Sequence, residues 1–492
     1  MVKTNANELS LIPISDYRLD ARFDLAFHLF IGGFLLICNI LPFPSISAFS
    51  LVLFCAYYVY LLVSNLKFVL KYLFFVFSIA INVFGVAVCE FASLHLNELA
   101  TSTAFSGSLP LLILARWLFL AILFLLDVRF GDDLLTERES FSYSVRSKWI
   151  PLATLVTTVV LAIALIDVMR SPPAFFAGVD RFSWESTYGN RFLPDKVASN
   201  LIYLLIIPAL SVRYGNRKLG ILAIALFITY SFWTGVKFGG YFELICIFVL
   251  VYYDLILKAD ARRLQSAAIG LFTVMVLLVG GAAYLNSLSS SNESTTTGYL
   301  LNRLAQQGQL WWKTFDQCDQ VHAEEFNNEI DIILHGDPTE ASNHVGSKQG
   351  LYMIMYYTAP RNIVNSKLAS GSSYTEAGYA SAYYYFGEFG VMVFSSVLAV
   401  VIWIAVTCFL KALNAARLID AVVILRIVFV AGTFLSMFWL GLFKPVSIAC
   451  YAYLLFSYLY RYEEGYRPIA HSPSNHSHGI SRGRSSPRSL IV

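Results

Sequence analysis

Charged residues are scarce in this chain. Asp, Glu, Lys and Arg make up 14% of the 492 residues, while hydrophobic residues make up 57%; a soluble protein carries about 25% charged residues. The basic residues are not gathered on one soluble face, so no nucleic-acid partner is expected. Several apolar runs exceed the ~18 residues needed to cross the hydrocarbon core of a bilayer. The sequence therefore predicts an all-α polytopic membrane protein.

Signals of other protein classes are missing as well. Residues 1–24 are polar and lack a cleavable apolar segment, so the first span is expected to act as its own insertion signal. Six of the seven cysteines fall in apolar runs and only Cys318 lies in a long polar loop, which is unlike a disulfide framework. Neither a Walker A motif nor a dinucleotide fingerprint occurs. We therefore expect no cofactor.

About twelve transmembrane helices are predicted. Loops with lysine and arginine alternate with loops that have few, and the loop at 90–108 has none. The positive-inside rule then places both termini in the cytoplasm. The predicted spans are 25–42, 46–63, 68–89, 109–128, 149–168, 197–212, 219–234, 240–257, 265–286, 384–410, 420–437 and 444–460.

Two long segments are predicted on the outer side, and long loops that are not linkers are usually functional. The larger one contains residues 299–315, whose apolar side chains have helical spacing, so we expect an amphipathic helix on the membrane interface. A second helix is predicted at 350–358, before Pro360. The predicted regions are a cytoplasmic segment at 1–24, a transmembrane region at 25–286 with an outer loop at 169–196, a large outer loop at 287–383, C-terminal transmembrane helices at 384–460 and a disordered cytoplasmic tail at 461–492.

Several basic residues lie in outer loops, where the positive-inside rule predicts few. The planar fork of arginine binds phosphate oxygens in a bidentate manner, so these residues are candidates for binding a diphosphate. The alternative is that they pair with acidic residues of the same loops; Lys237, in GVKFGG, has the further alternative of a lipid headgroup. The candidates are Arg361, Arg303, Arg181, Arg191 and Lys237.

Two residues are candidates for a general base. Glu376 lies just before a predicted span, where partial burial would raise the pKa of its carboxylate; its alternative role is to pair with Arg361. His344 is the second candidate. Two further cations, Arg116 and Arg426, lie inside predicted spans, where they are expected to bind a phosphate or a lipid, or to satisfy backbone carbonyls.

Aromatic residues near the outer side offer ring faces to sugars, although most aromatic residues of membrane proteins line the two interfaces. The candidates for stacking on a sugar are Trp184, Tyr188 and Tyr374. Hard cations bind carboxylate oxygens, but the nearby acidic set matches no strict ligand spacing, so no metal site is predicted. That set is Glu329, Asp331, His335 and Asp337.

A resemblance to a known family rests on four stretches of the sequence: RFSWESTYGNR, GVKFGG, LLNRLAQQG and TEAGYASAYYYFGEFG. With many spans, a modest outer loop containing arginine and a large penultimate outer loop, the chain resembles bacterial O-antigen or oligosaccharide repeat-unit polymerases of the Wzy type. The family's spacing of an arginine, ten residues and a glycine is not matched, because nine residues separate Arg361 and Gly371.

This resemblance implies a metal-independent glycosyltransferase of the bacterial inner membrane, with a C-type glycosyltransferase-like membrane fold. It would transfer a growing glycan from undecaprenyl diphosphate onto the sugar end of a new lipid-linked repeat unit. The implied partners are the lipid bilayer, undecaprenyl-diphosphate-linked oligosaccharide, a chain-length regulator and a flippase. Two alternatives remain: a transporter or flippase of the same lipid-linked oligosaccharide, and an O-antigen ligase-type glycosyltransferase.

Overall fold

The fold is known from a computed structural model of the protein. It describes residues 14–41, 43–136, 149–174, 176, 184, 187–188, 200–236, 238–260, 264–267, 269–270, 273, 296–327, 330, 350–369, 374–375, 377–415, 417–436 and 445–466. Among these the chain is mostly helical, consistent with the predicted all-α membrane protein, and the described strands form one short hairpin, β1 (His95–Leu96) with β2 (Thr101–Ser102).

Five described helices are long and apolar enough to cross a membrane: α2 (Pro44–Ser64), α4 (Leu73–Phe91), the first 22 residues of α5 (Leu109–Thr136), α7 (Trp149–Val168) and α21 (Ala377–Asn414). Shorter apolar stretches occur within α1, α10–α11, α13 and α23. The remaining helices are α1 (Ile14–Ile40), α3 (Leu66–Lys71), α10 (Leu201–Leu204), α11 (Ile206–Tyr214), α12 (Arg217–Trp233), α13 (Phe238–Val251), α14 (Tyr253–Lys258), α16 (Thr296–Ala305), α17 (Gln309–Gln317), η1 (Ala323–Glu325), α19 (Gly350–Thr358), α20 (Arg361–Ala369), α22 (Leu418–Ser436) and α23 (Pro445–Tyr466).

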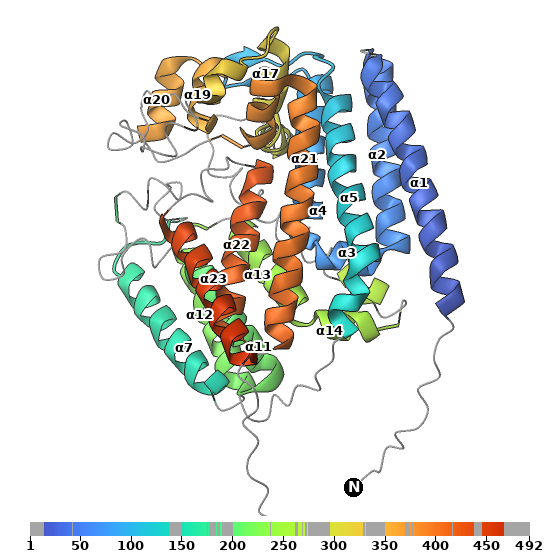
Figure 1. The fold of residues 1–492 in the computed structure, drawn as a ribbon. Helices are drawn as coiled ribbons and strands as arrows, with labels where there is room; N and C mark the ends of the chain where they lie inside the picture. Colours follow the sequence, from blue (N-terminus) through green and yellow to red (C-terminus); the bar gives the residue numbers. More distant parts are fainter. Residues whose placement is uncertain are drawn as a thin grey trace, which may run out of the picture.

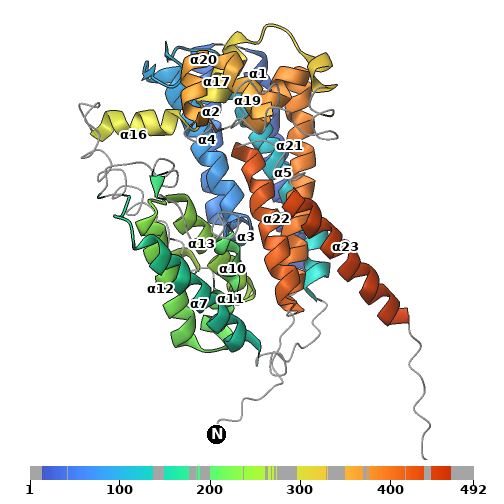
Figure 2. The same cartoon turned by 90° about the vertical axis from the view of Figure 1, so that its left-hand side faces the viewer.

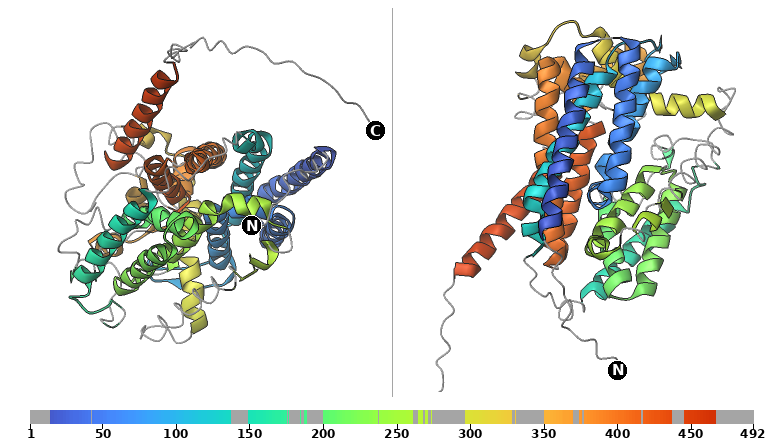
Figure 3. Two further views of the ribbon diagram at one scale, coloured as in Figure 1. Left: turned by 90° about the horizontal axis from the view of Figure 1, so that it is seen from below. Right: turned by 90° about the vertical axis from the view of Figure 1, so that its right-hand side faces the viewer.

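The helices form two groups. In the first, α4, α5, α21 and α22 pack together, with α1 and α2 alongside α5 (Figure 1). The second contains α7, α11, α12 and α13 and lies beside α4 and α22 (Figure 2). Viewed along the helices, α1–α2 and the second group lie at opposite edges, with the first group between them (Figure 3).

Helices α16, α17, α19 and α20 gather at one end of the first group, which we call the outer end (Figures 1 and 2). The start of α1 and the end of α23 lie toward the opposite, inner end (Figure 3). The described helices of the large predicted outer loop and the two terminal helix ends therefore lie at opposite ends of the bundle. Their orientation relative to a membrane stays a prediction. Helix α19 ends two residues before Pro360, so the predicted helix at 350–358 is confirmed.

Hydrogen bonds to Glu90, in the last turn of α4, connect the outer ends of α2, α4 and α5. Its buried carboxylate accepts hydrogen bonds from Ser47 Oγ of α2 at 2.7 Å and from Ser106 Oγ and Ser108 Oγ, both at 3.1 Å. It also accepts from the backbone N–H of Leu109, the first residue of α5, at 3.0 Å. The positive end of the α5 dipole favours a carboxylate there. This fixes the relative height of α2, α4 and α5.

Helix α21 is two helices joined by a reversal at Gly387. The backbone of Gly387 has φ 63° and ψ −152°, a left-handed region that favours glycine. Ser395 Oγ donates to the hydroxyl of Tyr379 at 3.1 Å, whereas residues sixteen apart on a straight helix lie ~24 Å apart. Residues 377–386 therefore run beside the span that follows, and the predicted span at 384–410 was wrong about its beginning.

The predicted helix at 299–315 was also wrong as a single element. It is broken into α16 and α17 by the turn at 306–308. Trp311 and Trp312 are buried, and their indole N–H groups donate to Ser108 O at 3.2 Å and Ala104 O at 2.9 Å. These side chains therefore pack the outer segment against the loop between α4 and α5, and they are buried within the protein.

Candidate functional site

The turn between α16 and α17 packs on the backbone of α4. A Cβ atom on Gly308 would lie 2.3 Å from Val86 N, and one on Gly85 would lie 2.6 Å from Leu304 O, so both positions require glycine. Gly85 precedes Phe91, the last residue of α4, by six residues, which is ~9 Å along the helix. The turn therefore lies below the outer end of α4, at a depth where irregular backbone has to be enclosed by protein.

This turn joins the outer segment to the residues before Gly387. Arg303, in the last turn of α16, is exposed and donates through Nη1 to Gln306 Oε1 at 2.8 Å. The backbone carbonyl of Gln306 accepts a hydrogen bond from Thr375 Oγ1 at 2.8 Å. Two stretches that lie far apart in the sequence, LLNRLAQQG and TEAGYASAYYYFGEFG, therefore meet at Gln306.

Glu98 connects four segments of the outer end. It lies in the loop between α4 and α5, and its carboxylate accepts from Gln309 Nε2 of α17 at 2.5 Å and pairs with Lys367 of α20. Its backbone carbonyl accepts from the hydroxyl of Tyr374 at 2.6 Å. Burial, and then the Glu98 charge, raise the pKa of Tyr374, so its hydroxyl remains a proton donor.

Arg116 of α5 contacts residues 377–386, which we call the reversed segment. Its side chain is fully buried, seven residues into α5 and ~10 Å along that helix from Leu109. The guanidinium carbon lies 3.8 Å from the ring centroid of Tyr379, a cation–π contact. We call these residues the outer polar cluster: Glu98, Arg116, Arg303, Gln306, Gln309, Lys367, Tyr374, Thr375, Tyr379 and Ser395.

Three residues that the sequence singled out belong to this cluster: Arg303, Tyr374 and Arg116. Arg361 is the exposed first residue of α20. It precedes the cluster member Lys367 by six residues, or ~9 Å along the helix. No contact of the described residues joins Arg361 to Arg303, and the role of Arg361 in binding the diphosphate stays a prediction.

The predicted sugar-stacking residues have different surroundings. Trp184 is 1% exposed, and its indole N–H donates to Pro172 O at 2.8 Å. Tyr374 is also 1% exposed. A ring buried to this extent presents no open face to a sugar, so both side chains have a packing role in this conformation. Tyr188 is half-buried, with its ring centroid 5.8 Å from that of Trp184, and its stacking on a sugar stays a prediction.

Other predictions lie outside the described residues. They are the two base candidates Glu376 and His344, the diphosphate candidates Arg181, Arg191 and Lys237, and the acidic set Glu329, Asp331, His335 and Asp337. Thr375 and Ala377, on either side of Glu376, are described, and Thr375 belongs to the cluster.

Sequence reasoning missed Glu98, Gln309 and Lys367. A weak signal existed for Glu98, because it is an acid in an outer loop without lysine or arginine. Lys367 lies in the closing polar stretch but was not chosen. Nothing in the local sequence pairs these two residues, which are far apart in the chain and meet only in the fold.

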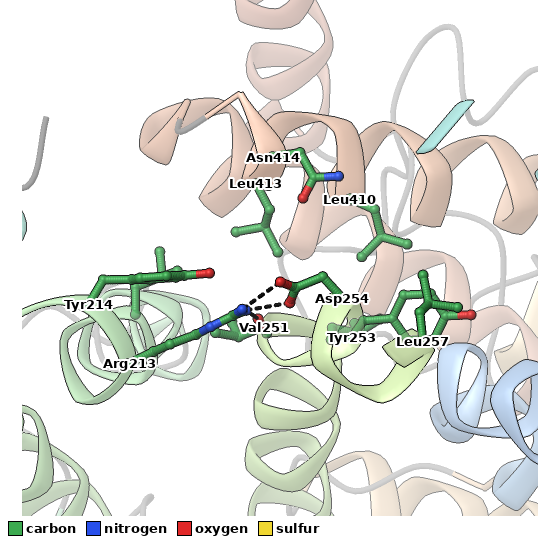
Figure 4. Close-up of a pocket in the computed structure, with 11 residues that line it drawn as sticks. Arg213, Tyr214, Val251, Tyr253, Asp254, Leu257, Leu410, Leu413 and Asn414 are labelled. Carbon is green, nitrogen blue, oxygen red and sulfur yellow. Dashed lines mark hydrogen bonds and ion pairs between the residues drawn. The ribbon is translucent and has the colours of Figure 1, made fainter. Parts of the chain in front are cut away.

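A small pocket of about 40 Å³ lies at the inner end, between α11, α13, α14 and the end of α21 (Figure 4). Arg213 lines this pocket. It donates to both carboxylate oxygens of Asp254, each at 2.5 Å, and to Val251 O at 2.5 Å. Burial alone would raise the pKa of Asp254, but the Arg213 hydrogen bonds and charge outweigh it and lower that pKa. Because Arg213 already has these acceptors, the pocket is a less direct candidate than the outer polar cluster.

Comparison with known protein families gives one match. A family of unknown function (DUF6418) matches residues 345–461, about a quarter of the chain. This range includes Lys367, Tyr374, Gly387 and Arg426, but not Arg303 or Arg116. No curated protein and no solved structure matches the chain.

Proposed function

We propose that the protein is a glycosyltransferase of the bacterial inner membrane that polymerises oligosaccharide repeat units linked to undecaprenyl diphosphate. The observation that carries the proposal is the hydrogen bond between Thr375 and Gln306. It joins the helix with Arg303 to the segment before Gly387, below the outer end of α4. Arg303 and Thr375, which come from two distant stretches of the chain, thereby lie in the same region. Thr375 directly precedes Glu376, the base predicted from the sequence.

The reaction breaks the bond between the anomeric carbon of the growing glycan and its diphosphate, and forms a new bond from that carbon to a sugar hydroxyl of the next unit. The diphosphate leaves with the electron pair, so negative charge grows on it and donors such as Arg303 stabilise it. The hydroxyl gives its proton to a base. Glu376 follows Thr375 directly and is retained as that base.

The proposal includes the finer features expected from the sequence. These are twelve spans, a C-type glycosyltransferase-like fold, both termini in the cytoplasm, and a flippase and a chain-length regulator as partners. The position of α16–α20 at the end opposite the α1 and α23 termini supports this topology. Arg116 and Tyr379 support the site indirectly, because their contact keeps the reversed segment against α5.

Arg303 provides the test. Arg303→Ala is expected to slow chain extension about a hundredfold or more, because the loss of a donor to a developing oxyanion costs ~2.7–4 kcal/mol. Arg303→Lys should recover only part of the rate, since an ammonium lacks the bidentate fork. The measurement is extension of purified lipid-linked repeat units by purified protein.

Lys313→Ala is the matched control. Lys313 lies on the neighbouring helix α17 and pairs with Asp316 at 2.8 Å, a local pair expected to contribute under ~1 kcal/mol and to leave the product unchanged. If Arg303→Ala extends glycan at nearly the wild-type rate while remaining folded, Arg303 does not bind the diphosphate.

A transporter of the same lipid is the second candidate. One observation favours it: Arg426 lies in the middle of α22, and transporters place binding sites near the midplane of the bilayer. Deletion of the gene, followed by gel analysis of surface glycan, separates the two functions. Loss of long chains with single-repeat products retained indicates a polymerase, and loss of all surface glycan with lipid-linked units stranded inside indicates a flippase.

A further inference from the structure

Arg426 is a cation in the interior of the membrane domain. It is the ninth of the 19 residues of α22, ~12 Å along that helix from Leu418. Helix α22 packs along α21, which is long and apolar enough to span a membrane. A cation at this depth is costly and is a functional candidate by default.

In the part of the chain that the structure describes, the hydrogen-bond partners of Arg426 are all neutral. Its Nε donates to Asn200 Oδ1 at 3.2 Å, and its Nη1 donates to Ser447 Oγ at 3.0 Å and lies 4.0 Å from Cys450 Sγ. These partners come from the start of α10 and from α23, and Ser447 is 1% exposed. Neutral acceptors fix the direction of the guanidinium without cancelling its charge.

The guanidinium has capacity for another acceptor. Its hydrogen bonds among the described residues use Nε and Nη1 and leave Nη2 available, and the side chain is partly exposed. The relevant acid nearby is Glu243, since Tyr203 lies within electrostatic range of both Glu243 and Arg426. No hydrogen bond or ion pair between Arg426 and Glu243 occurs in the described part of the chain.

We propose that Arg426 is the centre of an anion site within the membrane that binds the phosphate or diphosphate group of a lipid. An anion accompanied by a hydrophobic tail can reach this depth from the bilayer, and phosphate oxygens match the planar fork of arginine. Asn200 and Ser447 are positioning residues that orient the fork. The site lies outside the outer polar cluster, so it does not depend on glycosyl transfer at Arg303.

The test measures binding to the purified full-length protein in detergent, with farnesyl diphosphate as the probe. Arg426→Gln removes the charge and is expected to weaken binding about tenfold or more, since a charge-assisted contact is lost. Arg426→Lys keeps the charge without the fork, and a several-fold loss is expected. Lys411→Gln, which removes an exposed cation at the inner end of α21, is the matched control and should bind as wild type.

Two further probes identify the source of the phosphate. If inorganic pyrophosphate competes with farnesyl diphosphate for the wild-type protein but not for Arg426→Gln, the anion alone is recognised. If reconstitution into phosphatidylglycerol nanodiscs abolishes binding of the probe, the site binds membrane phospholipid instead of an isoprenyl carrier. Each result requires Arg426 and supports the proposal.

Unchanged probe affinity in a folded Arg426→Gln or in Arg426→Lys overturns the site, and so does equal weakening by Lys411→Gln. If Arg426→Gln does not fold, Arg426→Lys decides. The readout is binding and not chain extension, so the anion site and the polymerase proposal can fail separately: failure of glycan extension by the wild-type protein leaves the anion site intact.

Discussion

Arg213 and Arg426 are both arginines of the membrane domain, but their surroundings differ. Arg213 faces both oxygens of Asp254 and lies 4.4 Å from the ring centroid of Tyr214, so its charge is cancelled locally. Arg426 is held by an amide, a hydroxyl and a thiol, and no acidic side chain pairs with it among the described residues. The first arrangement is complete without a ligand, and the second is suited to receive an anion.

The largest expected effect is on stability at the inner end. Asp254→Asn leaves Arg213 without a carboxylate; breaking a buried pair costs 3–5 kcal/mol, and because the Asp254 side chain is 42% exposed we expect about 2 kcal/mol. Asn200→Ala removes a neutral partner of Arg426 and should cost about 1 kcal/mol or less. Thermal unfolding of the purified protein measures both, and equal losses would remove the distinction between the two arginines.

A smaller effect is expected in acid. The pKa of Asp254 is lowered in the folded protein. The pair with Arg213 therefore contributes its full share of the free energy of unfolding above the ordinary Asp pKa of 3.8, and this contribution is lost as pH falls through the folded-state pKa. Partial exposure limits this contribution to about 1 kcal/mol. Unfolding measured between pH 7 and pH 3 should therefore depend less on pH in Asp254→Asn than in wild type.

The amide side chain of Asn200 carries no titratable group, so Asn200→Ala should have the same cost at both pH values. A cost that changes with pH would show that an acid is coupled to Arg426. Glu243 would then be the first residue to replace, as Glu243→Gln.

The smallest effect is expected from Ser447→Ala. It removes one neutral bond from Arg426 and keeps the guanidinium, so stability should fall by under ~1 kcal/mol. Binding of farnesyl diphosphate should stay within a few-fold of wild type, because the charge remains. A loss of affinity as large as that of Arg426→Gln would show that Ser447 itself binds the anion.

Much of the fold was accessible from hydropathy alone. The predicted spans at 109–128 and 149–168 begin at the observed helix starts, because each long apolar run follows a polar stretch. Hydropathy does not record chain direction, however. Residues 384–386 (YYF) carry no charge and lead almost directly into the apolar run after Gly387, so the reversal looked like one continuous span.

The same limit applies to the turn at 306–308. Apolar side chains keep helical spacing through it, and the helix is interrupted where Gly308 meets Gly85, a contact between distant parts of the chain. Arg303 was found because a cation in an outer loop is unusual. The pairing of Glu98 with Lys367 was not found because it exists only in the tertiary structure.

Aromatic residues were the least predictable part of the site. Trp184 was chosen because an indole face fits a sugar, but the same indole also fits a packed interior, where it is observed. Its one polar atom bonds Pro172, as a buried tryptophan requires. Residue type alone does not separate these two roles.

The reversal at Gly387 imposes an order on the biosynthesis of the domain. Tyr379 precedes Gly387 in the chain, yet its ring contacts Arg116 of an earlier helix and its hydroxyl contacts Ser395 of a later one. Residues 377–386 can take their place only when α5 has been inserted and the span after Gly387 has emerged from the ribosome. The outer polar cluster is therefore among the last parts to be completed, and a nascent chain that ends before Ser395 does not yet contain it.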